Sequence, residues 1–155
     1  MEKFGLIFDL DGVLADTEAA NSAATIKVFE DLFNVHGVKR SDFEKGLGRG
    51  AEQYVLSAAK IHNLELTDDQ LIKATQLRQH YFLKHLKSNP LPPMPGVMDL
   101  IDSAFDSDDF ILAIATSGTL EKSKAVLDST DIPYDKIVYV NGNDVKNKKP
   151  DPELF

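Results

Sequence analysis

Apolar and polar positions follow two different periods along this chain of 155 residues. Short apolar runs with β-branched and aromatic residues predict buried strands at residues 4–9, 110–116 and 136–140. Between residues 17 and 35, apolar side chains recur every four positions, and this spacing predicts an amphipathic helix. Helical spacing also predicts helices at 50–62, 67–86, 96–106 and 119–129, with a short helix interrupted by glycines within 41–50.

The order of these elements predicts an α/β fold with an insertion. From about residue 96 onward, helices and strands alternate, which is typical of a parallel sheet covered by helices on both faces. Residues 16–91 are helical throughout, and the stretch "SNPLPPMPG" at 88–96 is typical of a hinge because it contains four prolines. We therefore expect a Rossmann-like core formed by residues 1–15 and 92–155, with a helical-bundle domain at residues 16–91 inserted after the first strand.

Composition and charge limit the kinds of molecule that the protein could bind and the compartment in which we expect it. The chain contains no cysteine, which excludes disulfides and thiolate metal sites and fits a reducing cytoplasm. A formal charge of −8 argues against binding to nucleic acid or to an anionic membrane surface. No apolar run reaches the roughly 18 residues that a membrane span requires. We expect a cytoplasmic protein, with a removed organelle-targeting segment left open; the charge does not exclude a small anionic substrate.

Polar residues follow each predicted strand at the point where it ends. Asp9 and Asp11 follow the first strand, "TSG" at 116–118 follows the second, and Lys148 and Lys149 lie in the loop after the third. Ligands of open α/β sheets bind at the carboxyl ends of the strands. Two carboxylates, a hydroxyl and an ammonium group suit a phosphoryl group and a hard divalent cation.

Each of these features also has a simpler interpretation. The two aspartates alone suit a turn or a helix cap. Thr116 and Ser117 suit the cap of the helix that follows, a role compatible with binding phosphate. Either lysine, taken singly, suits a solvated surface position. The joint occurrence and the order of the three segments favour a catalytic site.

Three segments resemble the motifs of the haloacid dehalogenase-like superfamily of phosphatases and phosphomutases. "DLDGVLADTE" is similar to its first motif, "AIATSG" to its second and "KKPDPELF" to its third. The helical insertion after the first strand resembles the superfamily's first cap class, C1. The nearest subgroup contains β-phosphoglucomutase, phosphoglycolate phosphatase and the CbbY-type sugar-phosphate phosphatases. The resemblance covers the whole chain and implies an α/β hydrolase acting on a small phosphorylated metabolite as a monomer.

The resemblance also implies roles for four catalytic residues. Asp9 would attack phosphorus and become an aspartyl-phosphate. Asp11 would protonate the leaving alcohol, take a proton from the hydrolytic water and give its main-chain carbonyl to Mg²⁺, which Asp9 would also bind. Thr116 would donate its hydroxyl to phosphoryl oxygens, and Lys149 would balance the negative charge. Because dehalogenases of the superfamily lack an acid at the position of Asp11, this residue favours phosphate chemistry.

Five further residues are implied as substrate-binding or loop-forming groups. Gly12 lets the chain turn after Asp11, and the backbone of Ser117 and Gly118 would add N–H groups to the phosphate cradle. Arg49, in "KGLGRG", would reach a second anionic group of the substrate, although a surface cation remains an equal alternative. Glu18 would set the hinge of the inserted domain or bind a substrate hydroxyl.

The superfamily's fourth acidic motif does not occur in this sequence. It would follow Lys149 by some twenty residues and complete the magnesium shell, so we expect a C-terminally truncated chain with an incomplete core. The leading hypothesis is a Mg²⁺-dependent phosphatase for a sugar phosphate or a phosphoglycolate-like ester. A phosphomutase of the β-phosphoglucomutase type and a non-catalytic phosphate-binding fragment remain alternatives.

Overall fold

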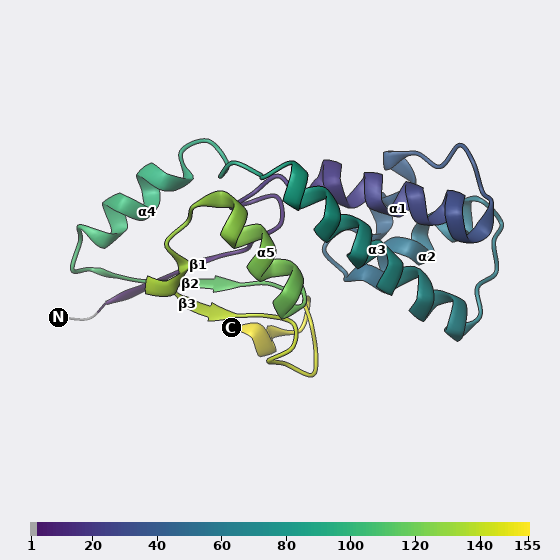
Figure 1. The fold of residues 1–155 in the computed structure, drawn as a ribbon. Helices are drawn as coiled ribbons and strands as arrows, with labels where there is room; N and C mark the ends of the chain where they lie inside the picture. The colour runs from purple at the N-terminus through teal and green to yellow at the C-terminus, as the bar shows by residue number, and fades with distance from the viewer. Residues whose placement is uncertain (1–2) are drawn as a thin grey trace. The chain divides into compact units, whose positions relative to one another are not determined.

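The computed structural model describes residues 3–155 and divides into two compact units (Figure 1). The first unit combines Met1–Thr17 with Pro90–Phe155, and the second is the continuous segment Glu18–Asn89. The chain therefore leaves the first unit after its first strand and returns to it at a proline. A unit that is interrupted in this way depends on contacts between its two distant segments.

A parallel sheet joins those two segments of the first unit. Its strands are β1 (Phe4–Phe8), β2 (Phe110–Ala115) and β3 (Val138–Val140), in the order β1-β2-β3. The register pairs Phe4 with Phe110 and Phe8 with Ile114, so β1 and β2 match along their whole common length. Both pairings are parallel, which confirms the predicted α/β class and brings the carboxyl ends of all three strands to one edge.

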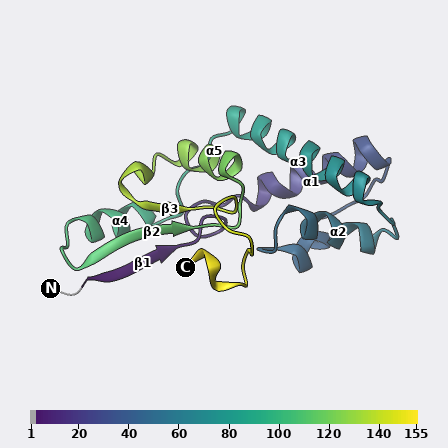
Figure 2. The same ribbon diagram turned by 90° about the horizontal axis from the view of Figure 1, so that it is seen from below.

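Only one face of this sheet is covered by the helices of the unit. Helices α4 (Val97–Phe105) and α5 (Leu120–Thr130) lie on the same side of the strands (Figures 1 and 2). Strands in sequential order with right-handed crossovers place both connecting helices on one face. Leu112 and Ile114 point into that layer and are buried. The prediction of a sheet covered on both faces is therefore wrong for the described residues.

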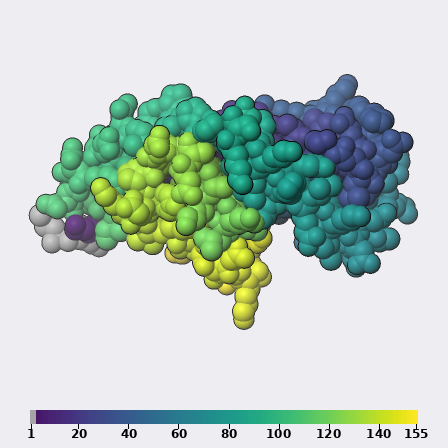
Figure 3. Space-filling view, viewed as in Figure 1, coloured from purple at the N-terminus to yellow at the C-terminus, as the bar shows by residue number. Residues whose placement is uncertain are grey.

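The opposite face carries apolar side chains that are exposed. Ile7 and Ile111 alternate with buried positions of their strands and are 46% and 52% exposed. Val138 of β3 is 56% exposed. The prediction of a fully buried first strand is also wrong, since only Phe8 of β1 is buried. The reason is that β1 lies at the edge of the sheet, with a neighbour on one side only. At the carboxyl end of the chain, Phe155 is 71% exposed, and the yellow C-terminal segment projects from this unit in Figure 3.

The second unit is built from helices around its own apolar core. It contains α1 (Glu18–Phe33), a 3₁₀ segment at Arg40–Gly46, α2 (Ala51–Ile61) and α3 (Asp68–Ser88). The core includes Phe29, Phe43 and Tyr54, and the rings of Phe43 and Tyr54 stack with centroids 4.5 Å apart. Gly46 is required beside this stack, because a Cβ atom there would lie 2.4 Å from the carbonyl oxygen of Gln53.

Local signals in the sequence account for several element boundaries. Thr67 caps α3 by accepting a hydrogen bond from the N–H of Gln70, whose side chain in turn accepts from the N–H of Thr67, as expected of a capping box. Asp151 caps the 3₁₀ turn at Pro152–Leu154. None of the helices described in residues 3–155 has the length and apolar content needed to cross a membrane.

Candidate active site

The loop after β1 holds Asp9 and Asp11 at the carboxyl edge of the sheet. The side chain of Leu10, between them, is buried. The main-chain carbonyl oxygen of Leu10 accepts hydrogen bonds from the N–H groups of Leu14 and Ala15, at 3.0 and 3.2 Å. Gly12 has φ of +79°, a left-handed conformation that glycine adopts without steric cost. The buried leucine and the tight turn thus fix the backbone from which both aspartates project.

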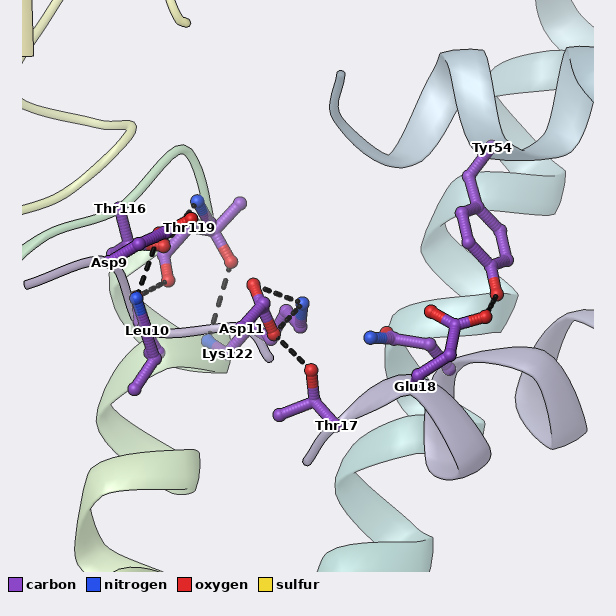
Figure 4. Close-up of polar contacts among 12 residues, drawn as sticks. Asp9, Leu10, Asp11, Thr17, Glu18, Tyr54, Thr116, Thr119 and Lys122 are labelled. Atoms are coloured by element: carbon purple, nitrogen blue, oxygen red, sulfur yellow. Dashed lines mark hydrogen bonds and ion pairs between the residues drawn. The ribbon is translucent and has the colours of Figure 1, made fainter. Parts of the chain in front are cut away.

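Asp9 is bound through one of its two carboxylate oxygens. Oδ1 accepts the N–H of Leu10 at 2.8 Å and lies 2.7 Å from Nζ of Lys149 (Figure 4 shows the Leu10 contact). Lys149 also donates to the carbonyl oxygen of Ala115, at 3.3 Å, so it joins the ends of β1 and β2. The side chain of Asp9 is 43% exposed. Among residues 3–155, no group binds its other oxygen, Oδ2, which can therefore receive a group that enters from solvent.

Side chains from other parts of the same unit hold Asp11. Thr17 Oγ1 donates to Oδ1 of Asp11 at 2.5 Å, and Nζ of Lys122 lies 3.0 and 3.1 Å from its two oxygens (Figure 4). Lys122 was not predicted from the sequence. Its signal is faint, because a single lysine in the first turn of a helix has no spacing that relates it to the loop after β1.

The loop after β2 places hydroxyl groups at the same edge of the sheet. Thr116 is buried; its N–H donates to the carbonyl of Val140 at 3.0 Å, and its Oγ1 accepts the N–H of Gly118 at 3.1 Å. A hydroxyl that accepts one hydrogen bond still has its own hydrogen to donate. The Oγ of Ser117 is buried without a hydrogen-bond partner among residues 3–155. A buried hydroxyl of this kind normally has a partner, so Ser117 fits a site for an acceptor such as a phosphoryl oxygen.

Thr119, rather than Thr116 or Ser117, caps the helix that follows. Its Oγ1 accepts the N–H of Lys122 at 3.3 Å, and α5 begins at Leu120. Capping is therefore not the role of Thr116 or Ser117. The N–H of Gly118, expected in the phosphate cradle, instead donates to Thr116.

Gly142 is a second residue that sequence analysis missed. Its N–H donates to the carbonyl of Gly118 at 2.7 Å, and a Cβ atom at this position would lie 2.5 Å from the carbonyl oxygen of Ser117. Only glycine permits this approach, which packs the loop after β3 against the loop after β2. The dipeptide "NG" at 141–142 signals a turn, but not the contact with the loop after β2.

Glu18 and Arg49 belong to the helical unit. Oε1 of Glu18 accepts the hydroxyl of Tyr54 at 2.7 Å (Figure 4) and lies 3.7 Å from Nε of Arg40. Arg49 is exposed and follows a turn in which its N–H donates to Gly46. Burial and the carboxylate of Glu18 together raise the pKa of Tyr54 far above its usual range, so this hydroxyl stays protonated and donates to Glu18.

The oxygen ligands at this edge of the sheet suit a hard cation that few protein groups bind. Among residues 3–155, no group of three or more His, Cys, Asp or Glu side chains could enclose a metal ion. Mg²⁺ is commonly held by one or two carboxylates, with water and substrate phosphate completing its shell. The partly exposed carboxylate of Asp9 fits that mode. Because Lys122 and Thr17 bind the carboxylate of Asp11, Asp11 would contribute through its main-chain carbonyl.

Comparison with known proteins assigns the chain to a family. A model of haloacid dehalogenase-like hydrolases matches residues 6–155. The chain belongs to this family. Protein CbbY of Rhodobacter capsulatus is 28% identical over 163 residues, covering 100% of this chain and 70% of that protein. The phosphorylated carbohydrates phosphatase of Thermotoga maritima is 31% identical over 150 residues, covering 97% of this chain and 66% of that protein.

Solved structures of this hydrolase family have the same fold. A structure of CbbY from Rhodobacter sphaeroides in complex with xylulose-(1,5)bisphosphate aligns with a TM-score of 0.80 at 21% identity, covering 99% of this chain and 69% of that one. At this identity the likeness concerns the fold alone. The match of the family model over residues 6–155 confirms the resemblance noted in the sequence. The chain spans about two thirds of the length of these relatives.

Proposed function

We propose that this chain carries the catalytic loops of a Mg²⁺-dependent phosphatase for a small phosphate ester. The observation that carries the proposal is the state of Asp9: Oδ1 is held by Leu10 and Lys149, while the side chain remains 43% exposed. A carboxylate fixed through one oxygen presents the other in a defined direction, as a nucleophile requires. Relatives named as phosphatases support the same reaction class.

In the first step, Oδ2 of Asp9 forms a bond to phosphorus as the bond from phosphorus to the substrate's alcohol oxygen breaks. Asp11 gives its proton to that oxygen, so the alcohol leaves as a neutral molecule. In the second step, water attacks phosphorus, the aspartyl-phosphate bond of Asp9 breaks, and Asp11 takes the water's proton. The enzyme returns to its starting form, and inorganic phosphate is released.

Three other side chains would stabilise the phosphoryl oxygens in both steps. Thr116 and Ser117 would donate hydroxyl hydrogens, and Lys149 would supply a fixed positive charge beside Asp9. A Mg²⁺ ion held by Asp9 and the carbonyl of Asp11 would reduce the repulsion between the carboxylate and the phosphate. Charge compensation matters because two like unit charges 4 Å apart repel by roughly 4 kcal/mol at an effective dielectric constant of about 20.

The substrate class proposed is a sugar phosphate or a phosphoglycolate-like ester. Support comes from the Thermotoga maritima relative, named a phosphorylated carbohydrates phosphatase, and from the ligand of the CbbY structure. The helical unit Glu18–Asn89 would serve as a lid. In it, the exposed guanidinium of Arg49 would bind a second anionic group, and Glu18 would orient the lid or a substrate hydroxyl.

Phosphate release from a panel of small phosphate esters tests the proposal. We expect Mg²⁺-dependent release by the chain that EDTA abolishes and that Asp9→Asn reduces by about a thousandfold or more. The matched control is Asp108→Asn, an exposed aspartate of the same unit. Circular dichroism of each protein establishes folding. Equal release by the Asp9→Asn variant, or none from the folded chain, would contradict the proposal; sugar bisphosphate formation instead of free phosphate would indicate a phosphomutase.

A further inference from the structure

Lys122 makes a two-oxygen ion pair with Asp11. Its Nζ lies 3.0 Å from Oδ1 and 3.1 Å from Oδ2, and the two side chains are 15% and 33% exposed, respectively. The pair is thus better shielded from water than that of Lys149 and Asp9, whose side chains are 22% and 43% exposed. Contact with both oxygens restricts the rotation of the carboxylate as well as its position.

The place of Lys122 in α5 is unusual for a lysine. It lies in the first turn of the helix, where the helix dipole favours acidic side chains and disfavours cations. A solvent-exposed lysine would avoid this cost by extending into water. Lys122 instead turns inward, toward the loop after β1. Local preferences that are broken in this way are found chiefly at functional positions.

Lys122 and Thr17, which bind the Asp11 carboxylate, are themselves anchored in the fold. The N–H of Lys122 is bound by the capping Thr119, which anchors the lysine backbone. On the other side, the buried Thr17 donates to Oδ1 of Asp11. Lys122 and Thr17 both donate to this carboxylate, and an ionised carboxylate accepts such hydrogen bonds. That form is the one that accepts a proton from water in the second step of the proposed reaction.

We propose that Lys122 is a positioning residue that orients Asp11 for the hydrolysis of the aspartyl-phosphate. The inference rests on the proposed function, since it assigns Lys122 to one of its two steps. Water forms the new bond to phosphorus, the bond to Asp9 breaks, and the water's proton passes to the oriented oxygen of Asp11. Lys122 itself exchanges no proton and forms no bond with the substrate.

Steady-state kinetics with p-nitrophenyl phosphate and Mg²⁺ distinguish an effect of Lys122 on the second step from an effect on the first. The p-nitrophenolate group leaves without being protonated, so the first step proceeds without Asp11. For Lys122→Met we expect kcat to fall by about tenfold to a hundredfold, with kcat/KM within about twofold of the wild type, because kcat/KM reports only the first step. A burst of p-nitrophenol equal to the enzyme concentration should precede the slow phase. Lys122→Arg should restore kcat substantially, and Lys124→Met, at an exposed position of the same helix, should change neither constant.

A second measurement tests the contact between Lys122 and Asp11 independently of catalytic turnover. Urea unfolding of Lys122→Met, Asp11→Asn and the double variant gives their coupling, and we expect about a threefold or larger departure from additivity in the unfolding equilibrium constant. Additive effects would overturn the inference, as would a fall in kcat/KM that matches the fall in kcat. If the wild-type chain turns over no ester, the proposed function fails, and the coupling alone decides whether Lys122 holds Asp11.

Discussion

The ammonium group of Lys149 lies 2.7 Å from Oδ1 of Asp9, although the two residues stand at opposite ends of the chain. The same group donates to the main-chain carbonyl of Ala115, at the end of the neighbouring strand. One lysine thereby joins the first and the second sequence motif at the edge of the sheet. A single side chain thereby both balances the charge of Asp9, the proposed nucleophile, and fixes its position.

Replacing Lys149 with methionine should remove activity without unfolding the protein. We expect phosphate release to fall by about a hundredfold or more, since a fixed charge beside Asp9, the proposed nucleophile, is lost. The free energy of unfolding should change by less than about 1 kcal/mol, because partly exposed ion pairs contribute little to stability. Kinetics and urea unfolding on the same samples measure both. Lys148→Met, at the exposed neighbouring position, is the control; an equal loss there would show that the general charge of the loop matters rather than Lys149.

The hydroxyl of Thr116 should matter for catalysis independently of its packing. Thr116→Val keeps the shape of this buried side chain but removes the hydroxyl, and we expect phosphate release to fall by about a hundredfold. Thr116→Ser keeps the hydroxyl and should retain most of the activity. Rates for the two variants, measured with the same ester, check the prediction. Similar losses in both would assign Thr116 a packing role alone.

Arg78 should be one of the strongest contributors to the stability of the helical unit. The buried guanidinium donates to Thr25 Oγ1 at 2.8 Å and to Asn21 Oδ1 at 2.7 Å, and it lies over the ring of Tyr54. Arg78→Met leaves polar groups of α1 without these donors, so we expect a loss of about 2–4 kcal/mol in the free energy of unfolding. Urea unfolding provides the measurement.

Arg40→Met is the matched control for Arg78. Its side chain is 62% exposed and its nearest carboxylate atom, on Glu18, is 3.7 Å away. We expect a change below about 1 kcal/mol for this variant. Comparable losses for the two arginines would contradict a special role for the buried network.

Asp42 should make the stability of the helical unit depend on pH in the acid range. Its Oδ2 accepts the N–H of Lys39 at 2.9 Å and lies 2.8 Å from Nε2 of His62. The Lys39 hydrogen bond first, and His62 second, hold the pKa of Asp42 below its ordinary value of 3.8. Because the pKa of Asp42 is lower in the folded state, its ionised carboxylate adds to the free energy of unfolding. This stabilising contribution is complete above pH 3.8 and is lost as the pH falls through the depressed pKa.

The unfolding free energy of the wild type should therefore decline more steeply below pH 4 than that of Asp42→Asn. Urea titrations between pH 7 and pH 2.5 measure the two curves. Asp108→Asn, at an exposed position, should follow the wild type. Parallel curves for the wild type and Asp42→Asn would show that the contacts of Asp42 do not favour its ionised form.

Local patterns in the sequence were sufficient to predict the elements and the motifs. Apolar periodicity located each α-helix and strand described in residues 3–155 to within a few residues, and the capping box at Thr67 marked the start of α3. The 3₁₀ turn at Tyr134–Lys136 was not predicted. The aspartates of the first loop were identified from their place after an apolar run. These features depend on neighbours within a few positions along the chain, and such neighbours are visible in the sequence.

The contacts that complete the site were decided by the tertiary structure. The pairing of Lys122 with Asp11 and the approach of Gly142 to Ser117 join segments that are far apart in the sequence. The open face of the sheet likewise follows from the order of the strands, because the sequential order β1-β2-β3 places α4 and α5 on one side. The sequence by itself determined which residue types stand at the ends of the strands. Which of them meet was decided only when the parallel register brought those ends to a common edge.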